Sequence, residues 1–283
     1  LSADIDGNIY LTGATEGDLD GQINNSLTDG FLSKFDPNGK KEWTKLLETD
    51  DSEYPQFISI GTDGSIYMAG VDYGSNSGGG SVFISKFNSN GKQKWQKFIG
   101  LENGGIDDLV TSPDGSIFIA GYTSNDLHGE TFNGGDDDVF IIKFNSEGER
   151  QWTKLHGSSS EDEATGLAIS TDGSLYLAGE TEGNIGGQNN YGDDDAFLSK
   201  FNTEGQIQWT RILGSSREDE PDDIAVDHNG DVFIIGETNG DYDNQSNFGN
   251  NDIFISKFSS DGDKYWSKLI GTNQDDEGKK ISL

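Results

Sequence analysis

The 283-residue sequence contains no cysteine, which excludes disulfide bonds and metal sites built on thiolates. It has only 4 prolines, and it lacks the run of about 18 apolar residues that a membrane-spanning helix needs. Low proline combined with 40 glycines and evenly spaced aromatic residues is typical of strands joined by tight turns. We therefore expect a folded, strand-rich protein with no membrane insertion.

Basic residues are also scarce, because 19 Lys and Arg stand against 51 Asp and Glu, for a net charge of −32. Such a surface repels nucleic acid and anionic lipid, so no nucleic-acid partner is expected. Self-repulsion on this scale opposes a compact state, and either a salty environment or bound cations relieve it. Adaptation to salt and Ca²⁺ binding are the two interpretations that remain open.

The chain begins at Leu1, with no initiator methionine and no charged-then-apolar leader. We interpret it as a processed product or as part of a larger polypeptide or assembly. The lack of free thiols suits an oxidising environment. An extracellular or cell-surface location is therefore predicted.

One sequence unit is repeated five times. Phe-Leu-Ser-Lys-Phe at residues 31–35 recurs in related form, and a tryptophan follows each copy. The related pentapeptides stand at residues 83–87, 140–144, 197–201 and 254–258, and the tryptophans are Trp43, Trp95, Trp152, Trp209 and Trp266. Each copy also has an Asp-Gly or Asn-Gly turn before an apolar segment that ends in glycine. Such dipeptides favour tight hairpins because both residues tolerate positive φ, so the unit is two hairpins in series.

The fourth copy shows the four strands, which we name A to D. Strand A is predicted at residues 167–171, B at 174–180, C at 196–202 and D at 206–213. Strand B is almost continuously apolar, which predicts burial on both faces, whereas D alternates like an outer strand. The repeated aromatic rings are expected to pack between neighbouring units.

Four antiparallel strands repeated every 40–60 residues or so are the signature of propeller blades. The predicted fold is therefore all-β, a five-bladed β-propeller of four-stranded antiparallel blades. A single domain over residues 1–283 is expected, with blades at about 1–49, 50–100, 101–157, 158–214 and 215–271. Residues 272–283 form a closing segment, because 276–283 align with the start of strand A and overlap the N-terminal segment. The alternative is that a sixth blade begins there.

The combined motifs resemble the bacterial β-propeller repeat called SBBP. The resemblance is clearest from Gly192 through residues 195–202 and 213–215 to residues 223–234. It implies extracellular or cell-surface bacterial proteins, often multi-domain, and no enzymatic activity that can be transferred to particular residues. The second copy departs most, since its loop at 72–81 is short and has serine where other copies have aspartate before strand C.

Repeated oxygen-bearing side chains at the two ends of the B–C loop are the candidate metal ligands. The set before strand C is Asp29, Asp138, Asp195 and Asp252, and the set that opens the loop is Asp18, Asp126, Asn184 and Asp241. Oxygen ligands on flexible backbone suit Ca²⁺, the one cofactor predicted. The alternative is that these side chains cap backbone N–H groups of the loop. A third acidic set, 162–163, 219–220 and 276–277, is expected to lie between blades, ahead of strand A.

Catalytic motifs are missing from the sequence. His128, His156 and His228 fall at unrelated positions of the repeat, so we expect surface residues and assign no catalytic residue. The first hypothesis is a non-catalytic extracellular binding or scaffold propeller that contacts a glycan or a cell-surface protein through its loops. The second is a multivalent carbohydrate-binding lectin. The third is a glycosidase with acidic residues at the central funnel.

Overall fold

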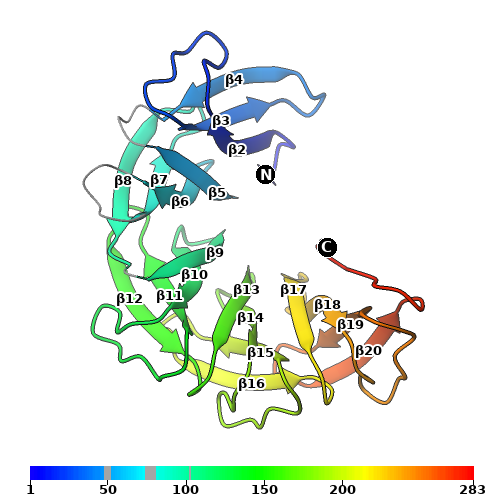
Figure 1. The fold of residues 1–283 in the computed structure, drawn as a ribbon. Coiled ribbons are helices and arrows are strands. Elements are labelled where there is room, and N and C mark those ends of the chain that lie inside the picture. The colour runs from blue at the N-terminus through cyan, green and yellow to red at the C-terminus, as the bar shows by residue number, and fades with distance from the viewer. Residues whose placement is uncertain (48–51, 74–80, 102) are drawn as a thin grey trace. The chain divides into compact units, whose positions relative to one another are not determined.

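The computed structural model describes residues 1–47, 52–73, 81–101 and 103–283, and in these ranges it contains strands and no helix (Figure 1). The strands form five four-stranded sheets, and within each sheet they neighbour one another in chain order. The predicted all-β fold of five four-stranded units is therefore confirmed. The predicted short loop at 72–81 lies mostly outside the described residues. In the part of the chain that is described, no helix is long and apolar enough to cross a membrane.

The bounds of the strands, sheet by sheet, are as follows. The first sheet has β1 (Ser2–Ala3), β2 (Ile9–Thr15), β3 (Asp29–Phe35) and β4 (Lys41–Leu46). The second has β5 (Glu53–Ile60), β6 (Ile66–Asp72), β7 (Ser81–Phe87) and β8 (Gln93–Ile99). The third has β9 (Gly104–Thr111), β10 (Ile117–Thr123), β11 (Asp138–Phe144) and β12 (Arg150–His156). The fourth has β13 (Asp162–Ile169), β14 (Leu175–Thr181), β15 (Asp195–Phe201) and β16 (Ile207–Leu213). The fifth has β17 (Asp219–Val226), β18 (Val232–Thr238), β19 (Asp252–Phe258) and β20 (Lys264–Ile270).

The chain divides into two compact units. One comprises Leu1–Glu102, Leu109–Phe118 and Lys143–Gln151, and the other comprises Asn103–Asp108, Ile119–Ile142 and Trp152–Leu283. The fourth and fifth sheets both belong to the second unit. The candidate site described below lies entirely within that unit.

Strand B is the most buried strand of the repeat, as its apolar sequence predicts. In β6, β10 and β14 the first five residues are all buried. Between the fourth and fifth sheets, Leu198, Ile224, Ile234 and Phe254 belong to one core cluster, all with little or no exposure. Stacked sheets thus bury faces that a single sheet would leave in water.

Strand A begins earlier than its apolar pattern predicts. In the fourth sheet, residues 162–164 pair with residues 179–181 of strand B, and a β-bulge separates them from the rest of the strand. The acidic set predicted to lie ahead of strand A is therefore the first part of β13, and likewise of β17. Backbone hydrogen bonds to strand B hold these residues in the sheet. Because the strand does not depend on apolar side chains here, the alternation of apolar residues could not predict where it begins.

The first four tryptophans contact the C–D turn of the next sheet without being fully buried, whereas Trp266, in the last strand, is exposed. Trp95, Trp152 and Trp209 each donate the indole N–H to a backbone carbonyl in the C–D turn of the next sheet, at 3.2 Å. A Cβ added to the glycine of that turn, such as Gly205, would lie 3.1 Å from the ring of Trp152. The ring therefore covers the turn of the next sheet while its polar edge reaches an acceptor.

The C-terminal segment, residues 271–283, contains no strand but contacts the fifth sheet as a strand A does. Asp276 N–H donates to the Asn251 carbonyl at 2.8 Å, and Ile281 N–H donates to the Asp223 carboxylate at 2.9 Å. The first residue of β17 and the sixth residue of β13 make the equivalent bonds. The predicted alignment with strand A is thereby supported, and closure by overlap with the N-terminal segment stays a prediction.

Candidate cation site

Acidic residues alternate where a B–C loop of one sheet meets strand A of the next sheet, a place that we call a junction. At the 3–4 junction, Asp162 is fully buried, whereas Glu161 and Glu163 are partly exposed. Asp138 is fully buried and Asp137 is partly exposed. Successive side chains of a strand point to opposite faces, so each segment aims one set of carboxylates inward and another outward.

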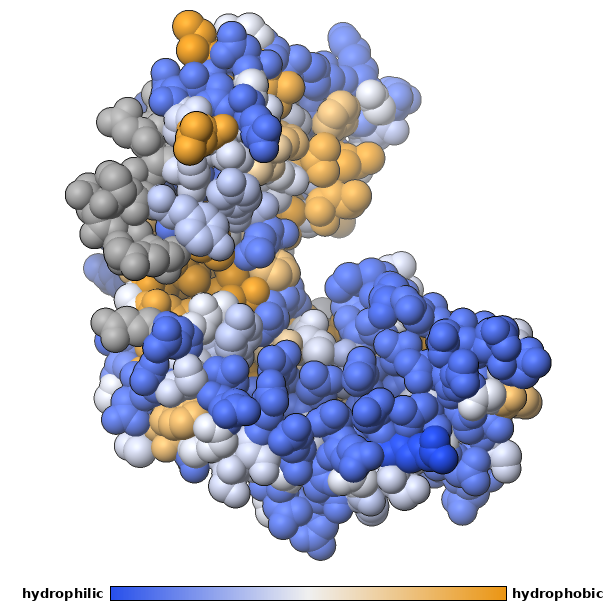
Figure 2. All heavy atoms as spheres, viewed as in Figure 1, coloured by the Kyte–Doolittle hydropathy of each residue, from blue (hydrophilic) through white to orange (hydrophobic). Residues whose placement is uncertain are grey.

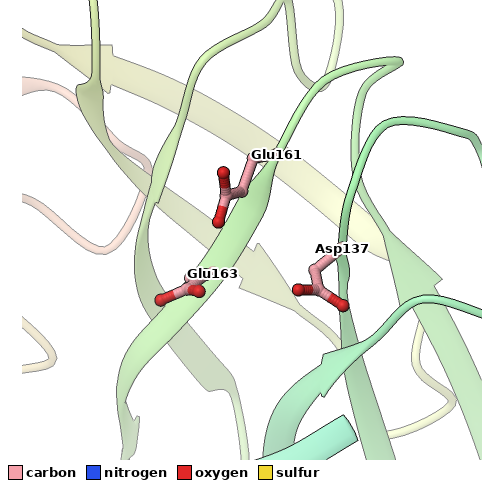
Figure 3. A group of neighbouring side chains, drawn as sticks. All are labelled: Asp137, Glu161 and Glu163. Carbon is pink, nitrogen blue, oxygen red and sulfur yellow. The ribbon is translucent and has the colours of Figure 1, made fainter. Parts of the chain in front are cut away.

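The outward set forms a compact trio. Figure 3 shows Asp137, Glu161 and Glu163 facing the same space, and one carboxylate oxygen of each lies within 4.8 Å of the others. The two segments are tied together by the Asp162 N–H, which donates to the Asp137 carbonyl at 2.9 Å. Since Ca²⁺ binds oxygens at about 2.3–2.6 Å, one ion spans oxygens up to about 5 Å apart. The trio therefore has the size and chemistry of part of a Ca²⁺ site.

The carboxyl groups in and around the trio raise one another's pKa values. Burial raises the pKa of Glu163, and the charge of Asp137 raises it further. Burial followed by the charges of Glu163 and other acids raises the pKa of Asp107 to about 7. Burial followed by the charges of Glu220, Glu163 and other acids raises the pKa of Glu180 to about 8. Every charged neighbour behind these shifts is another carboxyl group, so the cluster lacks a counter-charge.

The residues of the trio recur in the sequence at the other two junctions of the second unit, unchanged in type at the first and altered at the second; among the described residues, the converging group found is the one at the 3–4 junction. The 4–5 junction has Asp194, Glu218 and Glu220, and the C-terminal junction has Asn251, Asp275 and Glu277. In the view of Figure 2, hydrophilic residues cover most of the surface over the fourth and fifth sheets. The C-terminal junction is thus the one in which an amide replaces a carboxylate.

A lysine supplies a cation at the C-terminal junction. The Lys279 ammonium lies 3.2 Å from Asp222, 3.3 Å from Glu277 and 3.7 Å from Glu237. Glu237 is the counterpart of Glu180 in the preceding sheet. No ion pair found among the described residues involves the trio at the 3–4 junction. The C-terminal junction therefore has a basic side chain of its own, whereas the residue equivalent to Lys279 at the 3–4 junction is the uncharged Thr165.

The structure separates the eight ligands predicted from the sequence into two sets with different surroundings. The set that opens the loop is exposed, and each member accepts a hydrogen bond from the backbone N–H six residues later at 2.9–3.0 Å. These four are Asp18, Asp126, Asn184 and Asp241. Their contacts are those of the capping alternative.

The set before strand C is fully buried at the first residue of that strand. Its members Asp29, Asp138, Asp195 and Asp252 each use Oδ2 to accept a backbone N–H from the preceding loop. The sequence analysis did not single out Asp137, Glu161 or Glu180. The repeated Glu-Asp-Glu at 161–163 and 218–220, each placed after an Asp-Asp pair, was the available signal.

The expectation that all three histidines lie on the surface is wrong for His156. Its side chain is buried, with Nε2 2.8 Å from Ser199 Oγ, and it packs edge-on against Phe197 and Phe201. Burial lowers the pKa of His156 to about 4, so the ring is neutral at pH 7. His128 and His228 are exposed. His156 is the last residue of strand D, and its side chain points inward. The sequence did not reveal this, because no histidine occupies the equivalent position of another copy.

The chain is similar to proteins of several kinds. Residues 208–243 match the family described as β-propeller repeat (SBBP), which confirms the resemblance stated from the motifs. Over 224 residues, 70% of this chain, it is 30% identical to regulatory protein FlaEY of Caulobacter vibrioides, and the match covers 23% of that protein. Similar solved structures include the Neurospora crassa Pan2 WD40 domain, at TM-score 0.49 and 10% identity over 90% of this chain and 64% of that one. A gluconolactonase from Xanthomonas campestris has TM-score 0.45 and 14% identity over 86% and 71% of the respective chains.

Proposed function

Because the chain is a β-propeller with SBBP repeats, we propose that it is a non-catalytic binding or scaffold propeller outside a bacterial cell, stabilised by Ca²⁺ at its acidic junctions. The observation that carries this proposal is the trio at the 3–4 junction, whose ligand atoms converge within 4.8 Å. The net charge of −32 favours the same ions, since each one reduces the self-repulsion of the chain. The loops contact a glycan or a cell-surface protein, within a larger polypeptide or assembly.

Replacing Asp137 by asparagine tests the ion. The variant copies Asn251, which stands at the equivalent position of the C-terminal junction. Ca²⁺ at 100 times its Kd should stabilise the unaltered protein by about 2.7 kcal/mol. Asp137→Asn should lose most of the part of this increment that the trio contributes, because one of its three carboxylate ligands is gone. Calorimetric Tm values in Ca²⁺ and in EDTA, at matched ionic strength, measure the difference.

The matched control is Asp261→Asn, which removes the same charge from an exposed turn of the fifth sheet. This variant should keep the full Ca²⁺ increment. Equal losses in the two variants would show that general charge screening, and no site at the trio, produces the effect. An unaltered protein with the same Tm in Ca²⁺ and EDTA would refute the ion altogether.

The lectin alternative has its own supporting observation. A pocket of about 460 Å³ is lined by Tyr191, Arg211, Asp243 and Lys264, among others. The Tyr191 side chain is 64% exposed, while its backbone N–H is held by the buried Asp195. An accessible ring beside charged hydrogen-bonding groups suits a pyranose, which offers an apolar face and several hydroxyls.

Tyr191→Ala should weaken any sugar binding by at least tenfold, because the stacking ring is removed. Phe248→Ala is the control, since Phe248 takes the same loop position in the fifth sheet, is 58% exposed and does not line the pocket. A glycan array at millimolar sugar, with and without chelator, identifies the ligand, and titration calorimetry compares the variants. The lectin alternative is discarded when no glycan binds the unaltered protein.

The glycosidase alternative rests on Glu180. With a pKa of about 8 it is protonated at pH 7, as a general acid must be, and other carboxyl groups such as Glu163 stand near enough to raise that pKa. We place it third, after the lectin, because acids of the same type recur at the next junction and a cation at these acids would explain them without catalysis. Hydrolysis of chromogenic glycosides that is lost in Glu180→Gln would overturn the non-catalytic assignment.

A further inference from the structure

Pairs of buried aspartates link successive sheets on the inward side of the junctions. Each pair joins the first residue of a strand C to the first acidic residue of the next strand A. The pairs are Asp138 with Asp162, Asp195 with Asp219, and Asp252 with Asp276. The first five of these six side chains are fully buried or nearly so. Because the pair recurs at three successive junctions, it belongs to the repeated unit.

Each of those five buried carboxylates has one oxygen without a hydrogen bond. Oδ2 of Asp195 accepts the Gly192 N–H at 3.3 Å, and Oδ2 of Asp219 accepts the Ser215 N–H at 2.6 Å. The Oδ1 atoms of both residues are buried and have no hydrogen-bond partner. The same holds for Oδ1 of Asp138, Asp162 and Asp252. A buried polar atom with no partner is expensive, so its recurrence at all three junctions requires an explanation.

A glycine brings the two carboxylates of a pair together. A Cβ on Gly157 would lie 2.1 Å from Asp138 Oδ1 and 3.1 Å from Asp162 Oδ2. These two oxygens are therefore no more than about 5 Å apart, the span that one Ca²⁺ bridges. Asp162 Oδ2 also accepts the Ser158 N–H at 2.6 Å, and the partnerless Oδ1 belongs to the same carboxylate. At the other junctions a Cβ on Gly214 or Gly271 would lie 1.8 Å from Oδ1 of the strand-C aspartate. The absence of a side chain at this glycine lets the first carboxylate reach across toward the second.

Among the described residues, these pairs have no ion-pair partner. None of the ion pairs found among the described residues includes any of the six aspartates. Burial, together with Asp219, raises the pKa of Asp195 to about 6, and burial, together with Asp138, raises that of Asp162 to about 6. Two enclosed negative charges are tolerated when one divalent cation balances both.

We infer that each of these three junctions holds one divalent cation, with Ca²⁺ as the best match, between the buried aspartate of strand C and the aspartate that follows strand D. At the first two junctions the second aspartate is the buried first residue of the next strand A, so the ion joins two sheets; at the third it is the partly exposed Asp276 of the C-terminal segment. The ligands lie on the opposite face of the strands from the trio. The inference proposes a ligand set that differs from the one predicted from the sequence, which stays a prediction. It keeps Asp138, Asp195 and Asp252, replaces the loop-opening set by the strand-A aspartates, and is independent of the trio.

Ion counting tests this inference on the full chain. The protein is refolded with Ca²⁺, passed over chelating resin, and analysed for bound calcium by atomic emission. Asp195→Asn should carry one Ca²⁺ fewer than the unaltered protein. Asp241→Asn, which removes an exposed loop-opening carboxylate, should carry the same number. An undiminished count in Asp195→Asn overturns the inference. That result is expected if the two carboxylates of each pair share one proton and bind no ion, because the calcium count would then be the same in all variants.

Terbium luminescence keeps the test decisive even if Asp195→Asn fails to fold. Tb³⁺ replaces Ca²⁺ in oxygen sites, and its lifetimes in H₂O and D₂O report how many waters remain on the ion. In the unaltered protein the buried pairs should yield a population with almost no bound water. Ions at the partly exposed trio retain several waters and are lost in Asp137→Asn. If every bound Tb³⁺ keeps several waters, the buried pairs hold no ion, whatever the outcome at the trio.

Discussion

Gly179→Ala should destabilise the protein by about 3 kcal/mol, because the added methyl group has no space on two sides. Its Cβ would lie 2.3 Å from the backbone carbonyl oxygen of Glu163 and 2.6 Å from Cζ of Phe197. The carbonyl belongs to strand A just before its β-bulge, so the methyl group can be accommodated only if the ladder at 162–164 opens. Urea unfolding with a two-state fit measures the loss.

Gly13→Ala is the matched control, at the equivalent position of strand B in the first sheet. There β1 has only two residues, and the nearest atom to a new Cβ is the ring edge of Phe31 at 3.0 Å. A ring edge can shift by a few tenths of an ångström, so this variant should lose no more than about 1 kcal/mol. Equal losses in the two variants would contradict the role assigned to the bulge.

Gly179→Ala should also weaken Ca²⁺ binding at the trio, because Glu163 would move with the ladder.

The strands could be predicted from the sequence because their signals are local. An Asp-Gly turn, an apolar strand B and the aromatic anchors of strands C and D lie within a few residues of one another. The start of strand A could not be predicted in the same way. Residues 162–164 contribute a polar ladder across a bulge, and the apolar pattern therefore places the start of the strand at Leu167, five residues late.

The candidate site was half predictable for a related reason. Repetition identified the buried Asp138, Asp195 and Asp252, since each returns at one place of the unit. It could not identify their partners, because Asp162 is separated from Asp138 by the whole of strand D and meets it only when the sheets stack. Nor could it tell the inward face from the outward face, on which the distinction between the buried pairs and the trio depends.

Stability in the presence of a chelator should fall as the pH rises from about 4.5 to about 8, because Glu180 keeps its proton in the folded state. Its pKa is about 8 in the folded protein, mainly through burial, and the ordinary value for glutamate is about 4.3. Between these two values the folded state binds more protons than the unfolded state, so the free energy of unfolding decreases with pH. At 1.36 kcal/mol per pH unit, over about 3.7 units, the full loss from Glu180 is about 5 kcal/mol, complete above pH 8 and absent below pH 4.

Glu180→Gln should remove the part of this slope that Glu180 contributes. A smaller slope should remain, because burial also raises the pKa of Asp107 to about 7 and those of Asp162 and Asp195 to about 6. The amide keeps the shape of the protonated acid and cannot ionise, so the variant should match the unaltered protein near pH 5 and exceed its stability at pH 8. Urea unfolding in EDTA at pH 5, 6, 7 and 8 gives both slopes. Saturating Ca²⁺ should also flatten the slope of the unaltered protein, because the ion neutralises the acids that raise the pKa of Glu180.

Glu237→Gln is the control that separates the local charge environment from the substitution itself. Glu237 has the same place in the fifth sheet, but Lys279 lies 3.7 Å from it. Loss of this contact should leave stability at pH 8 unchanged or reduce it by up to about 1 kcal/mol. A gain at pH 8 in Glu237→Gln as large as that in Glu180→Gln would mean that removing any acid here relieves the net charge. The contrast between the two variants therefore tests whether the acids around Glu180 lack a neutralising cation such as the one that Lys279 supplies to Glu237.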